Sequence, residues 1–254
     1  MEALQVVKVS KEFGGLKALH EVSFSVNEKS IHGVIGPNGS GKTTLFNVIS
    51  GYYKPTSGEI WFQGKPIHRL TPYKTARTGL SRTFQNLRLF KKMTVIENVC
   101  TVLDQSAGVR IIDYVVNPRK IYRIEKEVIR KAEDILTNFR LLEWRDTKAE
   151  SLPYGVQKKL EIARALATNP KMLLLDEPAA GLNHTETDEL SSFIKSIRAD
   201  MDITVVVIEH DMKLVMSICD KITVMNEGTV LTEGIPSEVS KNADVITAYL
   251  GGQW

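Results

Sequence analysis

A glycine-rich segment with one lysine and two threonines, residues 36–44, carries the strongest chemical signal in the sequence. It follows the apolar run 31–35 and leads into residues 44–49, so we expect a buried strand, a loop and then a helix. The spacing G-x-x-x-x-G-K-[ST] is typical of a phosphate-binding loop, in which backbone N–H groups and the positive helix end face phosphate oxygens. The residues expected to bind nucleotide are Gly36, Pro37, Asn38, Gly39, Ser40, Gly41, Lys42, Thr43 and Thr44. Lys42 would reach the terminal phosphates, and the Thr43 hydroxyl would ligate Mg²⁺.

Two neighbouring acids, Asp176 and Glu177, form the second signal. They follow the apolar run 172–175, which predicts a buried strand whose carboxyl end presents both carboxylates. Asp176 is suited to hold Mg²⁺ through water, and Glu177 could polarise the water that attacks a terminal phosphate. The alternative, that these acids cap a helix or form a salt bridge in a loop, stays open at this stage.

Length, composition and charge exclude several classes of protein. A chain of 254 residues fits one large α/β domain, and 43% hydrophobic with 25% charged residues is ordinary for a folded protein. The net charge of +3 is too small to argue for nucleic acid. Cys100 and Cys219 form no CxxC pair and indicate reduced thiols in a cytosolic protein. No apolar run approaches the ~18 residues of a membrane span, so any work at a membrane would require docking on another protein.

The order of the expected elements predicts a parallel sheet with crossover helices. Short strand-like runs fill the first 60 residues, and further ones occur at 172–175, 203–208 and 222–225, with a helical stretch over 187–197. Between them, residues 118–142 have apolar residues at helical spacing. The helical stretch from about 90 to 165 therefore reads as an insertion into one α/β core.

These motifs, in their order along the chain, resemble the nucleotide-binding subunit of an ABC transporter. The resemblance covers nearly all of residues 1–254, and it rests on the phosphate loop, Gln85, the segment 152–157, the acids 176–177 and His210. It implies a single ABC ATPase domain of the α/β class. That domain would have a P-loop NTPase core with a parallel sheet, a small antiparallel β subdomain and the inserted α-helical subdomain. The implied activity is ATP hydrolysis, with ATP and Mg²⁺ as nucleotide and cofactor.

The resemblance also implies roles for single residues. Phe13 would stack on adenine, although a core phenylalanine is the alternative. Gln85 would ligate Mg²⁺ together with Thr43 and Asp176, and His210 would contact the γ-phosphate. Glu177, His210 and Gln85 are thus the expected catalytic residues. The other four histidines fit no motif and are expected to be solvated or packed.

The signature segment departs from the family. Where the family usually has Leu-Ser-Gly-Gly-Gln, this chain has Leu152, Pro153, Tyr154, Gly155 and Val156, followed by Gln157. We expect the segment to open a helix and to face the nucleotide of a partner subunit, with Pro153 at a first helical position. Proline lacks the serine hydroxyl and an amide N–H, so the contact would be weakened. Asn183 replaces the usual aspartate of the loop that crosses the dimer interface.

Two further stretches, 81–99 and 248–251, resemble the ATPase subunits of branched-chain amino-acid uptake systems. Importers for urea and other small solutes share them, so the solute stays open. The implied partners are a second ATPase subunit, identical or related, and multispanning permeases, with a solute-binding protein acting indirectly and no nucleic acid. The implied location is peripheral, at the cytoplasmic face of the membrane. Two alternatives remain: a soluble ABC ATPase acting on nucleic acid or ribosomes, and a weakly catalytic ATP-binding scaffold.

Overall fold

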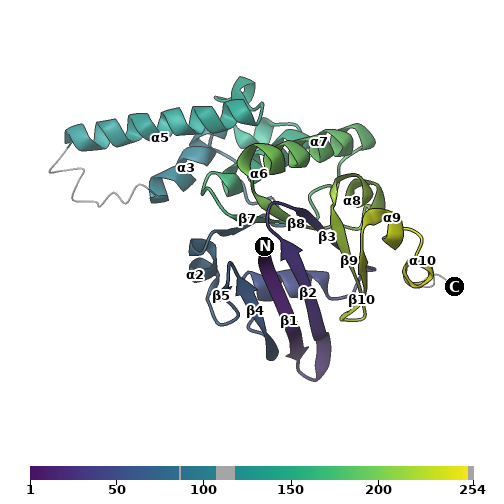
Figure 1. Cartoon of the computed structure of the whole chain (residues 1–254). Helices are drawn as coiled ribbons and strands as arrows, with labels where there is room; N and C mark the ends of the chain where they lie inside the picture. Colours follow the sequence, from purple (N-terminus) through teal and green to yellow (C-terminus); the bar gives the residue numbers. More distant parts are fainter. Residues whose placement is uncertain (86, 107–117, 251–254) are drawn as a thin grey trace. The chain divides into compact units, whose positions relative to one another are not determined.

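The computed structural model describes residues 1–85, 87–106 and 118–250, and it divides the chain into two compact units. The first unit joins residues 1–85 to residues 171–254, and the second consists of residues 86–170 (Figure 1). Segments far apart in sequence therefore build the first unit together. The second unit includes the stretch from about 90 to 165 in which we expect an inserted helical subdomain.

A six-stranded sheet in the first unit contains both strands that lead to the motifs. Its strands are β3 (Ile31–Ile35), β6 (Leu80–Arg82), β7 (Met172–Asp176), β8 (Thr204–Ile208), β9 (Lys221–Asn226) and β10 (Thr229–Gly234), in the spatial order β10-β9-β3-β8-β7-β6. All neighbours run parallel except β9 and β10. The expectation of a parallel sheet shared by the strands that end near Ile35 and Leu175 is confirmed.

A second sheet is antiparallel and has the order β2-β1-β4-β5. Its strands are β1 (Glu2–Phe13), β2 (Leu16–Asn27), β4 (Ser57–Phe62) and β5 (Lys65–Pro66). Buried residues alternate with more exposed ones over residues 22–26 of β2, so one face of this strand packs inward, as the alternation in the sequence indicates. In β1 the alternation is interrupted where its pairing with β2 shifts register. This sheet matches the small antiparallel subdomain that we expected.

Helix α1 (Lys42–Ile49) joins the two sheets, because one buried apolar cluster contains its residues and those of both sheets. Leu45 and Phe46 lie in this cluster with Leu174 and Val206. On the opposite face of β3, α8 (Met212–Ile218) and Cys219 pack closely against Gly33. The contact is so close that a Cβ at Gly33 would lie only 3.0 Å from the Cys219 Sγ. The remaining helices of this unit are α2 (Pro72–Arg77), α7 (His184–Met201), α9 (Pro236–Val239) and α10 (Ala243–Leu250).

The second unit is helical in the part that the structure describes. It contains α3 (Val95–Ser106), α5 (Pro118–Asn138), α6 (Tyr154–Leu166) and two short 3₁₀ turns, Leu142–Trp144 and Ala149–Ser151. The expected helix over 118–142 ends four residues early. Arg140 adopts a left-handed φ of 55° and the Leu141 N–H bonds back to the Leu136 carbonyl, which closes the helix end.

Among the helices described, none combines the length and the apolar character that crossing a membrane would require.

Candidate functional site

The phosphate loop takes the conformation that its glycines allow. Gly41, directly before α1, has a φ of 97°, and a Cβ at this position would lie 2.7 Å from the Ala18 carbonyl oxygen. Any other residue would therefore strain the backbone and collide with the start of β2. The helix begins at Lys42, two residues before the expected start, and Ser40 is buried against it. The glycines thus fix the place at which the helix N-terminus opens.

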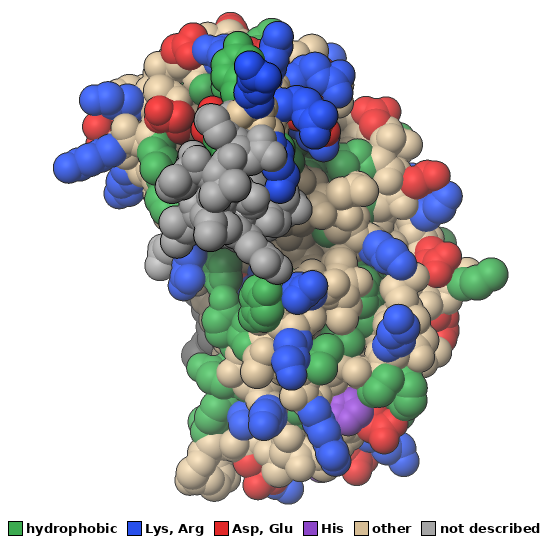
Figure 2. Space-filling view, turned by 90° about the vertical axis from the view of Figure 1, so that its left-hand side faces the viewer, with side chains coloured by type: hydrophobic (Ala, Val, Ile, Leu, Met, Phe, Trp, Pro, Cys, Tyr) green, Lys and Arg blue, Asp and Glu red, His purple; other side chains and the backbone are tan. Residues whose placement is uncertain are grey.

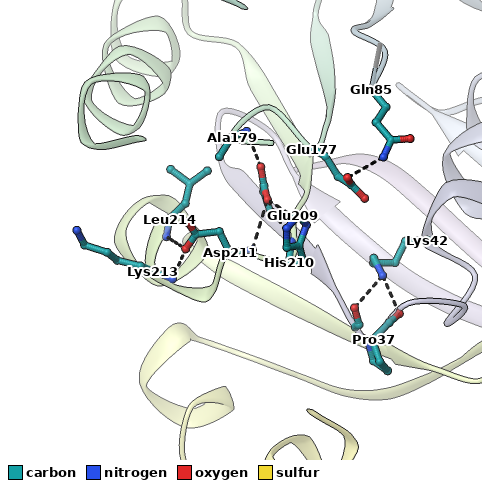
Figure 3. Close-up of polar contacts among 11 residues, drawn as sticks. Pro37, Lys42, Gln85, Glu177, Ala179, Glu209, His210, Asp211, Lys213 and Leu214 are labelled. Carbon is teal, nitrogen blue, oxygen red and sulfur yellow. Dashed lines mark hydrogen bonds and ion pairs between the residues drawn. The ribbon is translucent and has the colours of Figure 1, made fainter. Parts of the chain in front are cut away.

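Lys42 lies folded over its own loop. Its ammonium donates to the carbonyl oxygens of Gly36 and Pro37 at 2.7 and 2.9 Å (Figure 3). Burial lowers the pKa of Lys42, while the nearby charge of Glu177 opposes that shift. Carbonyl oxygens of the loop therefore hold the Lys42 side chain in the middle of the loop.

The two acids at the end of β7 face different partners. Asp176 is the last residue of the strand and is buried, whereas Glu177 follows it with a left-handed φ of 47°. The Glu177 N–H donates to the Ile208 carbonyl at 2.9 Å, and its carboxylate accepts a hydrogen bond of 2.9 Å from the Gln85 amide (Figure 3). Gln85 and Glu177, predicted as members of one site, therefore lie in direct contact.

Arg82, for which the sequence suggested no role, pairs with the other acid. Its guanidinium lies 2.7 Å from the Asp176 carboxylate, and the two side chains are only 6% and 5% exposed. The same guanidinium donates to Asn47 of α1 and to Ser50, which follows this helix, each at 2.8 Å. The only sequence signal was indirect: Arg82 lies three residues before Gln85, on a strand that pairs with β7.

His210 lies beyond the end of β8, with its side chain 58% exposed. The preceding Glu209 is fully buried and accepts N–H bonds from Ala179 at 2.7 Å and from His210 at 3.1 Å (Figure 3). Burial raises the pKa of Glu209, and these backbone donors partly offset that effect. Glu209 thus ties the segment after β8 to the segment after β7, a role that the sequence did not indicate.

Two hollows share Asn38 and Glu177 in their walls, whereas the buried Asp176 lines neither of them. The first, about 500 Å³, is lined by Leu16, Lys17, Ala18, Asn38, Gly39, Gly41, Lys42, Thr43, Thr44, Glu177, Glu227 and Gly228. The second, about 680 Å³, is lined by Gly36, Pro37, Asn38, Gln85, Glu177, His210, Ala248 and Tyr249. The predicted residues of the phosphate loop, Gln85, Glu177 and His210 are therefore gathered in one region of the first unit.

The sequence analysis missed several residues that line these hollows. Residues 16–18, at the start of β2, and residues 227–228, in the turn between β9 and β10, carried no chemical signal. Tyr249 comes from α10, and its hydroxyl is buried close to the backbone of Gly36. Burial raises the pKa of Tyr249 to about 12.

Phe13 does not line either hollow in the part of the chain described. It ends β1, the residue is 38% exposed, and its ring packs edge-on against that of Tyr53 at 5.2 Å, with the Lys11 ammonium 4.9 Å from the ring centroid. Residues just after it, at the start of β2, line the first hollow instead. Its stacking on adenine stays a prediction.

The signature segment belongs to the second unit, where it opens α6. Pro153 is the N-cap, with φ −52° and ψ 147°, and not the first helical residue as expected. It makes no side-chain cap, but its carbonyl accepts the Gln157 N–H, and the Gln157 amide donates to the Leu152 carbonyl at 2.9 Å. Tyr154, beside Gly155 and Val156, is 41% exposed. The role of this segment toward a partner's nucleotide stays a prediction.

On the face drawn in Figure 2, basic, acidic and apolar side chains are interspersed, in keeping with the small net charge of +3.

Comparison with known proteins identifies the family. The family model described as "ABC transporter" matches residues 19–180, and that of the "Branched-chain amino acid ATP-binding cassette transporter" matches residues 229–254. The high-affinity branched-chain amino acid transport ATP-binding protein BraF of Pseudomonas aeruginosa is 45% identical over 248 residues, which cover 98% of this chain and 97% of BraF.

Solved structures agree with this finding. The ADP conformation of MJ1267, an ATP-binding cassette of an ABC transporter, superposes with a TM-score of 0.86 at 36% identity and covers 99% of both chains. A dimeric post-hydrolysis state of the cassette MJ0796, bound to ADP and Pi, gives a TM-score of 0.75 at 25% identity, over 92% of this chain and 98% of that one. The chain therefore belongs to the ABC transporter family and has the fold of its ATP-binding cassettes.

Proposed function

We propose that this protein is the ATP-hydrolysing subunit of an importer for branched-chain amino acids. One observation carries the proposal: the phosphate loop, Gln85, Glu177 and His210 line two hollows that meet at Glu177. The Lys42 ammonium, the Glu177 carboxylate and the Gln85 amide would thus lie beside a bound triphosphate and its attacking water. The substrate class follows from the relatives' names, since BraF is named for branched-chain amino acid transport.

The phosphate loop would bind the nucleotide. Lys42 would exchange the carbonyl oxygens of Gly36 and Pro37 for oxygens of the terminal phosphates, to which an ammonium forms stronger, charge-assisted bonds. The N-terminus of α1 adds the field of its unpaired N–H groups. Phe13 would contribute a ring for adenine at the far end.

Mg²⁺ fits the donor set of this region. Its preferred ligands are oxygens, and the Thr43 hydroxyl, the Gln85 amide and the Asp176 carboxylate provide them beside the phosphates. Among the described residues no group of three or more His, Cys, Asp and Glu side chains could hold a metal alone, which favours a cation that binds together with phosphate. When bound, Mg²⁺ would offset negative charge on the phosphates during hydrolysis.

Glu177 would act as the general base. Its carboxylate lines both hollows and is held by Gln85, so it can accept a proton from a water aimed at the terminal phosphate. That water forms a bond to phosphorus as the bond to the ADP oxygen breaks, which gives ADP and phosphate. His210, on the wall of the second hollow, would donate a hydrogen bond to the same phosphate.

We infer that the active form is a head-to-tail pair of cassettes. The dimeric MJ0796 cassette, bound to ADP and Pi, supports pairing within this fold. Each segment 152–157 would then close over the nucleotide held by the other subunit's Lys42. The cassettes would dock on multispanning permeases at the cytoplasmic face of the membrane. A solute-binding protein would deliver the solute to these permeases.

The Glu177→Gln substitution tests the hydrolytic role. The glutamine has the same size and can keep the contact with Gln85, but it cannot take a proton, so we expect kcat for ATP to fall by about 10²- to 10⁴-fold. Binding of a fluorescent ATP analogue should stay close to that of the parent, and ATP-dependent dimers should accumulate in light scattering.

The matched control is Glu143→Gln, an exposed glutamate of the second unit, which should leave kcat unchanged. Turnover by Glu177→Gln within about twofold of the parent would remove Glu177 from this role. The solute is tested separately, by uptake of radiolabelled leucine into cells that carry the complete transporter with either variant. Active ATPase without leucine uptake would leave the enzyme in place and overturn the proposed solute.

A further inference from the structure

A buried ion pair joins Arg82 to Asp176, one of the two acids of the site, and the mechanism above gives no role to Arg82. Asp176 Oδ2 accepts from Arg82 Nη2 at 2.7 Å, and both side chains are almost completely buried. Its other oxygen, Oδ1, accepts no hydrogen bond from any residue that the structure describes. Arg82 is therefore the ionic partner of this carboxylate, and the pair is shielded from solvent.

Arg82 is itself held from several directions. Its Nη1 donates to Asn47 Oδ1 and to Ser50 Oγ, each at 2.8 Å, so the guanidinium connects β6, β7 and α1. Three aromatic rings surround it, with centroids 5.3–5.8 Å from the guanidinium carbon: those of Phe46, Tyr52 and Phe84. Its Nε is buried without a hydrogen-bond partner among the described residues. A planar cation in such a cage has little freedom to follow a moving carboxylate.

Glu177, like Asp176, is held by a side chain of the segment 82–85. Arg82 holds Asp176 and Gln85, three residues later, holds Glu177 at 2.9 Å. The Thr83 N–H between them donates to the Leu174 carbonyl, which fixes the two strands in register. One short segment therefore places both carboxylates, the first through a cation and the second through a neutral amide.

We propose that Arg82 is a positioning residue that fixes and neutralises the Asp176 carboxylate, so that a divalent cation enters this site together with the nucleotide and not ahead of it. The inference rests on the proposed function, in which Asp176 faces the metal. A carboxylate paired with a guanidinium attracts a divalent cation far less than a free one does. The phosphates of the nucleotide then supply most of the negative charge that binds the metal.

The experiment uses Mn²⁺ as the metal probe and the full chain without added nucleotide. In a Mn²⁺ titration followed by electron paramagnetic resonance, we expect Arg82→Met to reach half-saturation at a Mn²⁺ concentration roughly tenfold or more below that of the parent. Mn²⁺ should also raise the Tm of this variant and leave that of the parent unchanged. In Arg82→Met/Asp176→Asn both effects should vanish, and the Tm without metal should recover in part because no bare carboxylate is buried.

Two further variants separate charge from geometry. Arg82→Lys keeps a positive charge but carries its donors on a single nitrogen, so it cannot reach Asp176 from one nitrogen and Asn47 and Ser50 from another as the guanidinium does. It should bind as little Mn²⁺ as the parent while kcat for ATP falls by roughly ten- to hundredfold. Lys221→Met removes the cation from an ion pair outside the site, Lys221 to Glu233 at 2.9 Å, and should produce no Mn²⁺ site.

The results distinguish failure of the inference from failure of the proposed function. If the parent hydrolyses ATP and Arg82→Met gains no Mn²⁺ binding over the parent, the neutralising role is refuted. If Arg82→Met does not fold, the Arg82→Lys variant provides the test. A kcat for ATP equal to that of the parent in Arg82→Lys would refute the positioning role. If the parent itself neither binds nor hydrolyses ATP, the proposed function fails first.

Discussion

The buried histidine of β3 gives a stability prediction whose size follows from its environment. His32 is 1% exposed, stacks on Phe24 at 5.6 Å, and its Nε2 lies 2.8 Å from the Thr223 hydroxyl oxygen. Thr223 donates its own proton to Glu233 at 2.7 Å, so its oxygen accepts from His32 and the ring is a neutral Nε2–H tautomer. Burial, with a smaller effect of the Lys221 charge, lowers the pKa of His32 to about 3.

Stability depends on pH here because the folded and the unfolded chain protonate His32 at different pH values. The unfolded chain binds a proton at this histidine below its ordinary pKa of 6.5, whereas the folded chain does not until about pH 3. The contribution of His32 to stability is therefore complete above pH 6.5 and is lost as the pH falls from there toward 3. Between pH 7.5 and pH 5.5 the loss is about 1.4 kcal/mol, the free energy of protonating one such group in the unfolded chain.

The assay is urea unfolding, followed by circular dichroism at both pH values, of the parent and of His32→Gln. The glutamine amide can still donate to Thr223 but does not titrate, so the stability difference between the two proteins should shrink by about 1.4 kcal/mol at pH 5.5. Other groups, such as Glu209 with its raised pKa and its opposite slope, cancel in this comparison. A difference that stays constant to within about 0.4 kcal/mol would show that the folded protein protonates His32 normally.

Two further substitutions test helix caps. Pro153→Ser gives α6 a side-chain cap that Pro153 does not provide. Loss of the proline also gives the unfolded chain more conformational freedom, which lowers stability. The two effects should nearly cancel, so the unfolding free energy should change by less than about 0.5 kcal/mol. If the serine hydroxyl also reaches a partner's nucleotide, steady-state ATPase activity should rise by up to about tenfold, and a fall in both activity and Tm would contradict this reasoning. Asn183→Ala removes the capping box that Asn183 forms with Glu186 at the start of α7, and it should cost about 1 kcal/mol in urea unfolding. Asn183→Asp, which keeps an acceptor, should cost much less.

The parts of the fold that the sequence predicted are those set by local pattern. The glycine spacing of residues 36–41 and the apolar runs before Ile35 and Asp176 depend on neighbours in the chain, and the strands they predict lie in one sheet. Helix boundaries were less accurate, because caps decide them. The helix after Asn183 begins at His184, three residues earlier than its apolar residues indicate, since Asn183 and Glu186 cap each other.

The parts of the site that the sequence did not predict depend on contacts between distant residues. Arg82 and Asp176 are 94 positions apart, and neither residue type alone indicates a buried pair. Tyr249 lines the second hollow only because α10 packs where it does, which no local pattern encodes. Pro153 was misplaced by one position, since proline is compatible with both the cap and the first helical residue.

The left-handed backbone of Glu177 has a consequence for how this site evolves and can be engineered. A glutamate at a φ of 47° costs free energy that an asparagine, which tolerates this conformation, would largely avoid. We therefore expect Glu177→Asn to unfold at a higher temperature than the parent while losing hydrolysis. If Glu177 is the general base of the proposed function, selection for thermal stability alone would replace this glutamate, whereas selection for turnover would retain it.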